Sequence, residues 1–148
     1  IEDIYSGRGI AESVHSGNMR DSQIEVSRFT RERDEGLIIA NFIDFDMHYG
    51  HRRDPAGYAK ALQQVDGWLG DYIRLLQSDD ILILTADHGN DPTFKGTDHT
   101  REYVPLLCYS PERAGRSLGL RQGFFDIAQS LATYFNIPEM TYGKSFLD

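Results

Sequence analysis

Two apolar runs separated by a long amphipathic segment constrain the fold of this chain more than any other feature. Residues 37–43 (LIIANFI) and 81–86 (ILILTA) are continuous hydrophobic runs, typical of strands buried on both faces of a parallel sheet. Between them, Asp54 and Pro55 suit a helix start, and apolar side chains then recur at helical spacing to about Leu76. Strand, helix and strand form a βαβ unit, which predicts an α/β fold with a mostly parallel sheet and flanking helices.

Shorter elements complete the predicted fold. They are a short strand over residues 1–5, a helix over 21–36, a third strand over 104–109 and a second well-formed helix over 124–135. Asp21 or Ser22 can cap the first of these helices, and Gly36 follows its end. The whole chain, residues 1–148, is therefore interpreted as one α/β body.

Length and charge limit the classes of protein to which this chain could belong. A chain of 148 residues can bury a core of its own. With 23 acidic against 15 basic side chains the net charge is −8, which argues against binding nucleic acid or an anionic membrane. No apolar run approaches the roughly 20 residues that span a membrane. The single cysteine, Cys108, cannot form an internal disulfide, so we expect a buried thiol and a reducing, cytoplasmic location.

The acidic residues are unusual because 15 are Asp and only 8 are Glu, an excess that points to caps, turns and metal sites. Asp and His gather in two clusters, residues 44–51 (DFDMHYGH) and 87–99 (DHGNDPTFKGTDH), and each follows an apolar run. Strand ends in one parallel sheet would bring both clusters to the same edge. The mixture of carboxylates and imidazoles suits manganese, zinc or iron better than magnesium or calcium.

The residues alone leave the ligands open. Candidates in the first cluster are Asp44, Asp46, His48 and His51, and candidates in the second are Asp87, His88, Asp98 and His99. In the alternative interpretation, an Asp after a strand only caps the following turn. The long aperiodic segment from residue 86 to 104 favours a functional role, because structureless loops of that length are uncommon in compact domains.

Other chemistries find little support in the sequence. It contains neither a G-x-x-x-x-G-K-[ST] phosphate loop nor a G-x-S-x-G nucleophile motif. Arg52, Arg53 and Arg101 have forked donors that suit phosphate, but a solvated or ion-paired arginine is an equally good interpretation. His15 lies in a polar stretch and is expected at the surface. Two metal ions, rather than an evident nucleophile, would then carry any phosphoryl chemistry.

The strings NFIDFDMHYGHRRDPAGYAKAL and TADHGNDPTFKGTDHTREYVPLL resemble the phosphopentomutase family of the alkaline phosphatase-like metalloenzymes. The resemblance extends from IEDIYSGRGI to the closing YGKSFLD, so it covers essentially the whole chain. It implies an alkaline phosphatase-like core and a dinuclear, usually manganese, site. By resemblance, Asp87 and His88 hold one metal, whereas Asp46, His51 and His99 hold the other. Asp44 and His48 match no family ligand and are expected to line the site.

The family reaction interconverts ribose 1-phosphate and ribose 5-phosphate, and the 2-deoxyribose pair, through a phosphorylated threonine. That threonine, a further Asp ligand and the sugar-phosphate contacts of a cap domain match nothing in these 148 residues. The resemblance therefore implies the C-terminal part of the core. We expect this part alone to lack mutase turnover, to bind metal incompletely, and to associate with itself or with the missing segment. A cofactor-independent phosphoglycerate mutase, another phosphohydrolase or a non-catalytic metal-binding domain are the alternatives.

Overall fold

The long helix predicted between the two apolar runs is present as α3 (Pro55–Tyr72) and is followed by a 3-10 turn, η2 (Ile73–Leu75). The Asp54 carboxylate accepts a hydrogen bond of 2.9 Å from the backbone N–H of Gly57, and Pro55 occupies the first helical position. The carboxylate satisfies one of the free N–H groups at the helix start, and proline has no N–H that could be left unpaired there. The helix prediction is confirmed, with Ala61 buried on its inner face.

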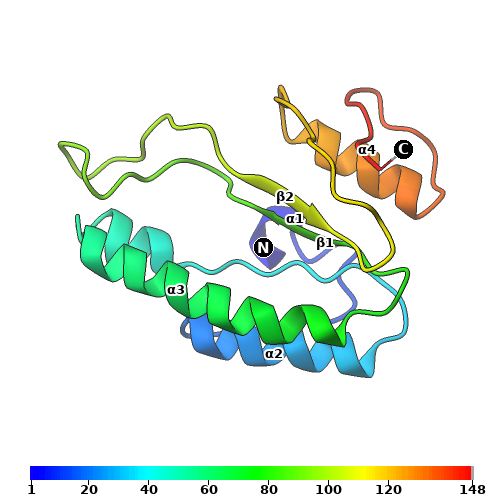
Figure 1. Cartoon of the computed structure of the whole chain (residues 1–148), viewed down its shortest axis with the longest axis horizontal. Coiled ribbons are helices and arrows are strands. Elements are labelled where there is room, and N and C mark those ends of the chain that lie inside the picture. Colours follow the sequence, from blue (N-terminus) through cyan, green and yellow to red (C-terminus); the bar gives the residue numbers. More distant parts are fainter. Residues whose placement is uncertain (148) are drawn as a thin grey trace. The chain divides into compact units, whose positions relative to one another are not determined.

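A computed structural model describes residues 1–147 of the chain (Figure 1). The chain divides into two compact units, Ile1–Glu112 and Arg113–Asp148, which are described separately below. Besides α3 and η2, the first unit contains α1 (Glu2–Tyr5), α2 (Met19–Glu32), a π-helical turn η1 (Phe45–Gly50), β1 (Leu82–Thr85) and β2 (Leu106–Tyr109). Within residues 1–147, no helix is both long and apolar enough to cross a membrane.

Helices α2 and α3 lie side by side in the first unit (Figure 1). The Trp68 indole N–H donates to the Ser27 hydroxyl at 3.3 Å, and the hydroxyls of Thr30 and Tyr72 lie 2.8 Å apart. The Trp68 and Tyr72 rings stack with centroids 4.7 Å apart. The N-cap of α2 is Asn18 rather than the predicted Asp21 or Ser22, because its side chain accepts the Asp21 backbone N–H. The hydrogen bonds of Trp68 and Tyr72 hold α3 against α2.

The sheet corrects the fold prediction. In the described residues it has two strands, β1 and β2, and they run antiparallel, with Leu82 opposite Tyr109 and Thr85 opposite Leu106. The predicted strands at 81–86 and 104–109 are thus real, but the mostly parallel sheet is not seen. The physical reason is the connection between them: a loop returns the chain directly, and parallel strands would need a crossover.

The apolar run 37–43 does not form the predicted strand: within residues 1–147, it has no ladder partner. Leu37, Ile38 and Ile39 remain 54%, 40% and 50% exposed, although Phe42 packs edge-on against Trp68 with ring centroids 5.6 Å apart. A hydrophobic run forms a doubly buried strand only when neighbouring strands supply the missing hydrogen bonds. The sequence pattern therefore identified the hydrophobicity of this segment but not its pairing.

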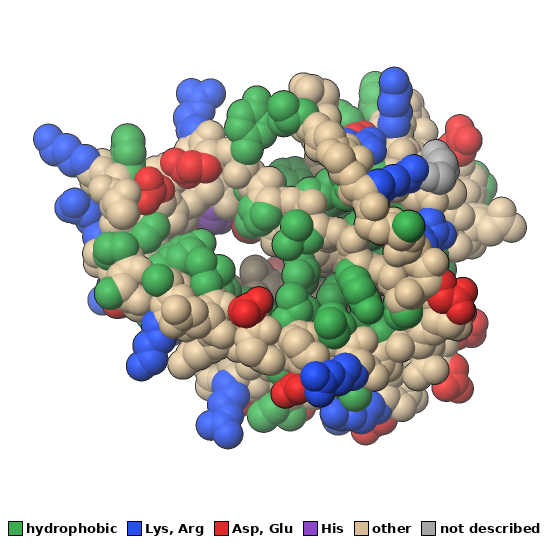
Figure 2. Space-filling view, viewed as in Figure 1, with side chains coloured by type: hydrophobic (Ala, Val, Ile, Leu, Met, Phe, Trp, Pro, Cys, Tyr) green, Lys and Arg blue, Asp and Glu red, His purple; other side chains and the backbone are tan. Residues whose placement is uncertain are grey.

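Two smaller predictions also change. Residues 1–5, expected as a strand, form the short helix α1, which ends at Ser6 in the left-handed conformation (φ 51°). Cys108 is half-buried rather than fully buried, and it lines an apolar groove of about 370 Å³. The groove lies between α3 and the sheet, with Leu69 and Leu107 on its walls. Hydrophobic side chains gather over the middle of the face seen in Figure 2.

The second unit is built around α4 (Phe125–Tyr134), which matches the helix predicted over 124–135. Three buried polar side chains of α4 bind the backbone of the closing segment. Asp126 accepts the Lys144 N–H at 2.9 Å, Gln129 accepts the Met140 N–H at 2.8 Å, and Ser130 accepts the Phe146 N–H at 2.9 Å. Buried backbone donors need such partners, so α4 fixes the path of this segment and buries Phe146.

Candidate metal centre

The first Asp/His cluster forms the π-helical turn η1, which places Asp46 and His51 on one side of the chain. In a π-helix each backbone N–H bonds five residues back, and here the His51 N–H donates to the Asp46 carbonyl at 3.0 Å. The His51 Nε2 atom consequently lies 3.4 Å from Asp46 Oδ2. Single π turns occur frequently at functional sites, and this one was not predicted from the sequence.

The second cluster is held by an isolated antiparallel bridge between Gly89 and Thr100, in the loop that joins β1 to β2. The Thr100 N–H donates to the Gly89 carbonyl at 3.0 Å. Gly89 is needed here because a Cβ would collide with the Thr100 carbonyl and the Glu102 carboxylate. The bridge brings together two histidines 11 positions apart: the rings of His88 and His99 stack with centroids 3.7 Å apart.

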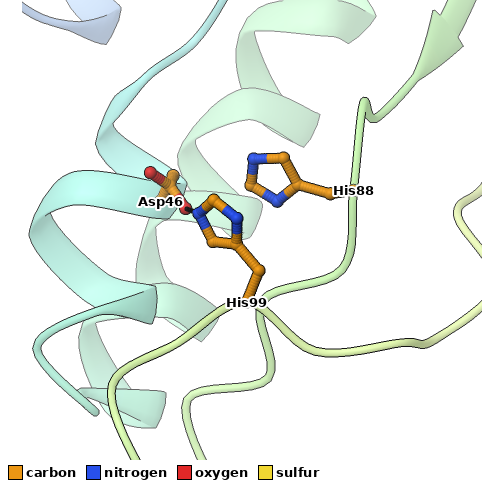
Figure 3. A group of neighbouring side chains, drawn as sticks. All are labelled: Asp46, His88 and His99. Carbon is orange, nitrogen blue, oxygen red and sulfur yellow. Dashed lines mark ion pairs between the residues drawn. The ribbon is translucent and has the colours of Figure 1, made fainter.

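Asp46, His88 and His99 form the centre of the site (Figure 3). Each offers one ligand atom, and these three atoms all lie within 4.8 Å of one another. His99 Nε2 is 3.2 Å from Asp46 Oδ1. His51 lies next to this group, with its ring centroid 4.9 Å from that of His99 and its Nδ1 atom 2.5 Å from the Thr97 carbonyl. Two segments far apart in the sequence thus converge on one group.

The remaining candidate metal ligands do not belong to this central group. Asp87 is next to His88 in the chain, but its side chain is 75% exposed and reaches only to 3.7 Å from His88 Nε2. Asp44 is buried, and its Oδ2 atom has no hydrogen-bond partner among the described residues. His48 and Asp98 are exposed. Of the five ligands implied by resemblance, four therefore lie close together. These are Asp46, His51, His88 and His99, whereas Asp87 lies outside this group.

The donor set fits a divalent metal of intermediate softness. Two imidazole nitrogens and one carboxylate oxygen are typical ligands of zinc, manganese and iron in proteins. The Nδ1 atom of His51 faces a backbone carbonyl, the kind of outer contact that orients metal-binding imidazoles and leaves Nε2 directed toward the site. The side chains are between one-third and one-half exposed, so an ion could enter from solvent.

Comparison with known families assigns the chain. The profile described as "Metalloenzyme superfamily" matches residues 2–139, which includes both clusters. The chain belongs to the Metalloenzyme superfamily. This membership gives the convergence of Asp46, His88 and His99 a metal-binding context beyond the geometry itself.

Several proteins that are similar to this chain share one name. Proteins named phosphopentomutase from Aliivibrio salmonicida, Caldanaerobacter subterraneus subsp. tengcongensis and Alkaliphilus oremlandii are 52%, 50% and 45% identical to this chain. Each alignment covers 99% of this chain but only 36%, 38% and 38% of the respective relative. The chain thus spans little more than a third of the length of these relatives.

Two residues that sequence reasoning missed support the site of this superfamily member. The Asn90 side-chain amide donates to Asp46 Oδ1 at 2.6 Å, and the Thr100 hydroxyl accepts the Asp91 backbone N–H at 2.8 Å. Asn90 lies inside the second Asp/His cluster and Thr100 directly follows it, but neither is a usual metal ligand. Burial, with a smaller contribution from the Asp46 carboxylate, raises the pKa of Tyr58.

The turn after His88 gives a testable pH effect. The Thr93 hydroxyl, followed by the Thr93 backbone N–H, donates to Asp91 and lowers the pKa of that carboxyl below its usual range. A lowered folded-state pKa stabilises the turn above the unfolded pKa, and this stabilisation is lost as the pH falls through the folded value. We expect Thr93→Val to raise the Asp91 pKa, measured by NMR titration of its carboxyl carbon. Thr133→Val, in α4, is the control. An equal shift of the Asp91 pKa in that variant would contradict the role of the Thr93 hydroxyl.

Proposed function

We propose that this chain is the metal-binding part of a phosphopentomutase, an isomerase that moves a phosphoryl group within a pentose phosphate. The substrates would be ribose 1-phosphate and ribose 5-phosphate, with their 2-deoxyribose equivalents. One observation carries the proposal: Asp46, His88 and His99 converge on one point in a chain whose relatives at 45–52% identity are named phosphopentomutase. The cytoplasmic location predicted from the single cysteine belongs to the same proposal.

The proposed cofactor is a pair of divalent ions, most simply manganese. Asp87 and His88 would hold one ion, and Asp46, His51 and His99 the other. The closeness of Asp46, His51 and His99 supports the second set, and His88, whose ring stacks on that of His99, would hold its ion beside it. When bound, such ions neutralise phosphoryl charge and hold the attacking and leaving oxygens in line.

The residues of this chain would act by holding donors in place. The π turn fixes Asp46 relative to His51, and the Gly89–Thr100 bridge fixes His88 relative to His99. Rigid placement matters because a catalytic centre loses much of its rate when its groups are displaced by about 1 Å. The phosphate-accepting threonine is not assigned to any residue of this chain.

A hybrid enzyme tests the proposal. The segment of the Aliivibrio salmonicida phosphopentomutase that aligns with this chain is replaced by the chain itself, so the relative supplies everything else. We expect the hybrid to convert ribose 1-phosphate to ribose 5-phosphate in the presence of Mn²⁺ and to leave 3-phosphoglycerate unchanged. His88→Ala in the hybrid should reduce turnover by at least about 100-fold, since it removes a metal donor.

The matched control is His15→Ala, which removes an 87% exposed histidine that pairs with Glu2. It should leave the turnover unchanged. A folded hybrid with no turnover, or one that prefers 3-phosphoglycerate, would contradict the proposed activity.

A further inference from the structure

Asn90 lies beside the proposed metal centre without belonging to it. Its Nδ2 atom donates to Asp46 Oδ1 at 2.6 Å, and both side chains are partly buried. An ionised carboxylate only accepts hydrogen bonds, so the amide must present its NH₂ group to Asp46. Hydrogen bonds to a charged acceptor are among the stronger ones in proteins.

Gly50 makes room for this amide. A Cβ atom built at Gly50 would overlap the Asn90 Cγ, Nδ2 and Oδ1 atoms well inside van der Waals contact. Gly50 is buried at the end of η1, and its φ angle is not one that only glycine adopts. The requirement for glycine here is therefore the volume of the Asn90 side chain rather than the backbone conformation.

We propose that Asn90, seated against Gly50, is a positioning residue that fixes the orientation of the Asp46 carboxylate toward the metal. The inference rests on the proposed function, because it takes Asp46 as a metal ligand. The Asp46 side chain is 32% exposed, and its terminal torsion is broad and soft in the absence of a partner. With Asn90 on Oδ1, the carboxylate plane is held, and its other lone pairs stay directed toward His51 and His99.

Mn²⁺ binding to the full 148-residue chain, followed by electron paramagnetic resonance, tests the role of Asn90. Asn90→Leu keeps most of the side-chain volume but removes the donor, and Asn90→Ala removes both. We expect either variant to weaken Mn²⁺ binding by about 10- to 100-fold, the usual effect of losing an outer partner of a metal ligand. Gly50→Ala should produce a similar loss, because its methyl group displaces the amide from Asp46.

A double-mutant cycle separates positioning from general stability. In Gly50→Ala/Asn90→Ala the new methyl group enters the space that the amide vacated, so binding should be no weaker than in Asn90→Ala alone. With Co²⁺ as the probe, the visible absorption of Asn90→Leu, Asn90→Ala and Gly50→Ala should change in shape, which a purely structural role would not cause. Gly67→Ala, in α3 where nothing approaches the new Cβ, is the control and should bind Mn²⁺ normally.

The outcomes are distinguishable. Suppose that the unmodified chain binds Mn²⁺ and that the Asn90 variants show the same Mn²⁺ affinity and the same Co²⁺ spectra. This result would overturn the positioning role of Asn90 but not the proposed metal centre. Additive losses in the double variant would also overturn this role. If the unmodified chain binds no Mn²⁺, the proposed metal centre is wrong, and this role of Asn90 is overturned with it.

Discussion

Asp46→Ala is expected to weaken Mn²⁺ binding by the chain more than about 100-fold. Asp46 is the only carboxylate of the three-residue group, and it also contacts His99 at 3.2 Å and His51 at 3.4 Å. Its loss removes a charged donor and the acceptor that holds both imidazoles toward the centre. The effect should exceed the 10- to 100-fold typical of outer partners, because Asp46 would bind the ion directly. Isothermal titration with Mn²⁺ measures it.

The fold should survive this substitution, since the Asp46 side chain is one-third exposed and belongs to no hydrophobic core. Asp71→Ala is the matched control: its side chain is 84% exposed and pairs with Arg74 on the surface. It should bind Mn²⁺ like the unmodified chain. Equal affinity in Asp46→Ala, with an unchanged circular dichroism spectrum, would remove Asp46 from the proposed ligands.

Phe146→Ala is expected to destabilise the unit around α4 by about 3–5 kcal/mol. The Phe146 side chain is 3% exposed, and the Arg121 guanidinium lies 5.5 Å from its ring centroid. Its backbone is held as well, because the N–H donates to Ser130 and the carbonyl accepts from Arg116 at 2.9 Å. Removing the ring leaves a cavity that these backbone bonds prevent from closing. Hydrogen exchange of the α4 amides should accelerate accordingly.

Tyr142→Ala provides the comparison within the same closing segment. Its side chain is 73% exposed, so its removal should change the free energy of unfolding by no more than about 0.5 kcal/mol. Equal protection of α4 in the two variants would show that Phe146 does not hold this unit together.

The helices and the site were more predictable than the sheet. Asp54–Pro55 marks the start of α3 because capping is local chemistry, written in adjacent residues. The pairing of residues 37–43 depends on neighbours elsewhere in space, and a hydrophobic run carries no information about them. Strand direction was missed for the same reason. The loop between β1 and β2, not the strands themselves, determines that they are antiparallel.

For the site, too, the residues could be predicted from the sequence but their spatial arrangement could not. The Asp and His content of the two clusters predicted a metal centre, and Asp46, His88 and His99 do converge. Their convergence, however, depends on a π turn and on one isolated bridge, and the sequence contains no signal for either beyond Gly89 and Gly50. Asn90 was missed because an amide acts here through its position beside Asp46, not through its ability to bind metal.

The most direct measurement is anomalous X-ray diffraction at the manganese edge from crystals of this chain grown with Mn²⁺. We expect an anomalous peak beside this group, within bonding distance of Asp46 and His99, which disappears in crystals of Asp46→Ala. A well-ordered site with all three side chains in place and no peak, or a peak bound only by other residues, would contradict the proposed metal centre.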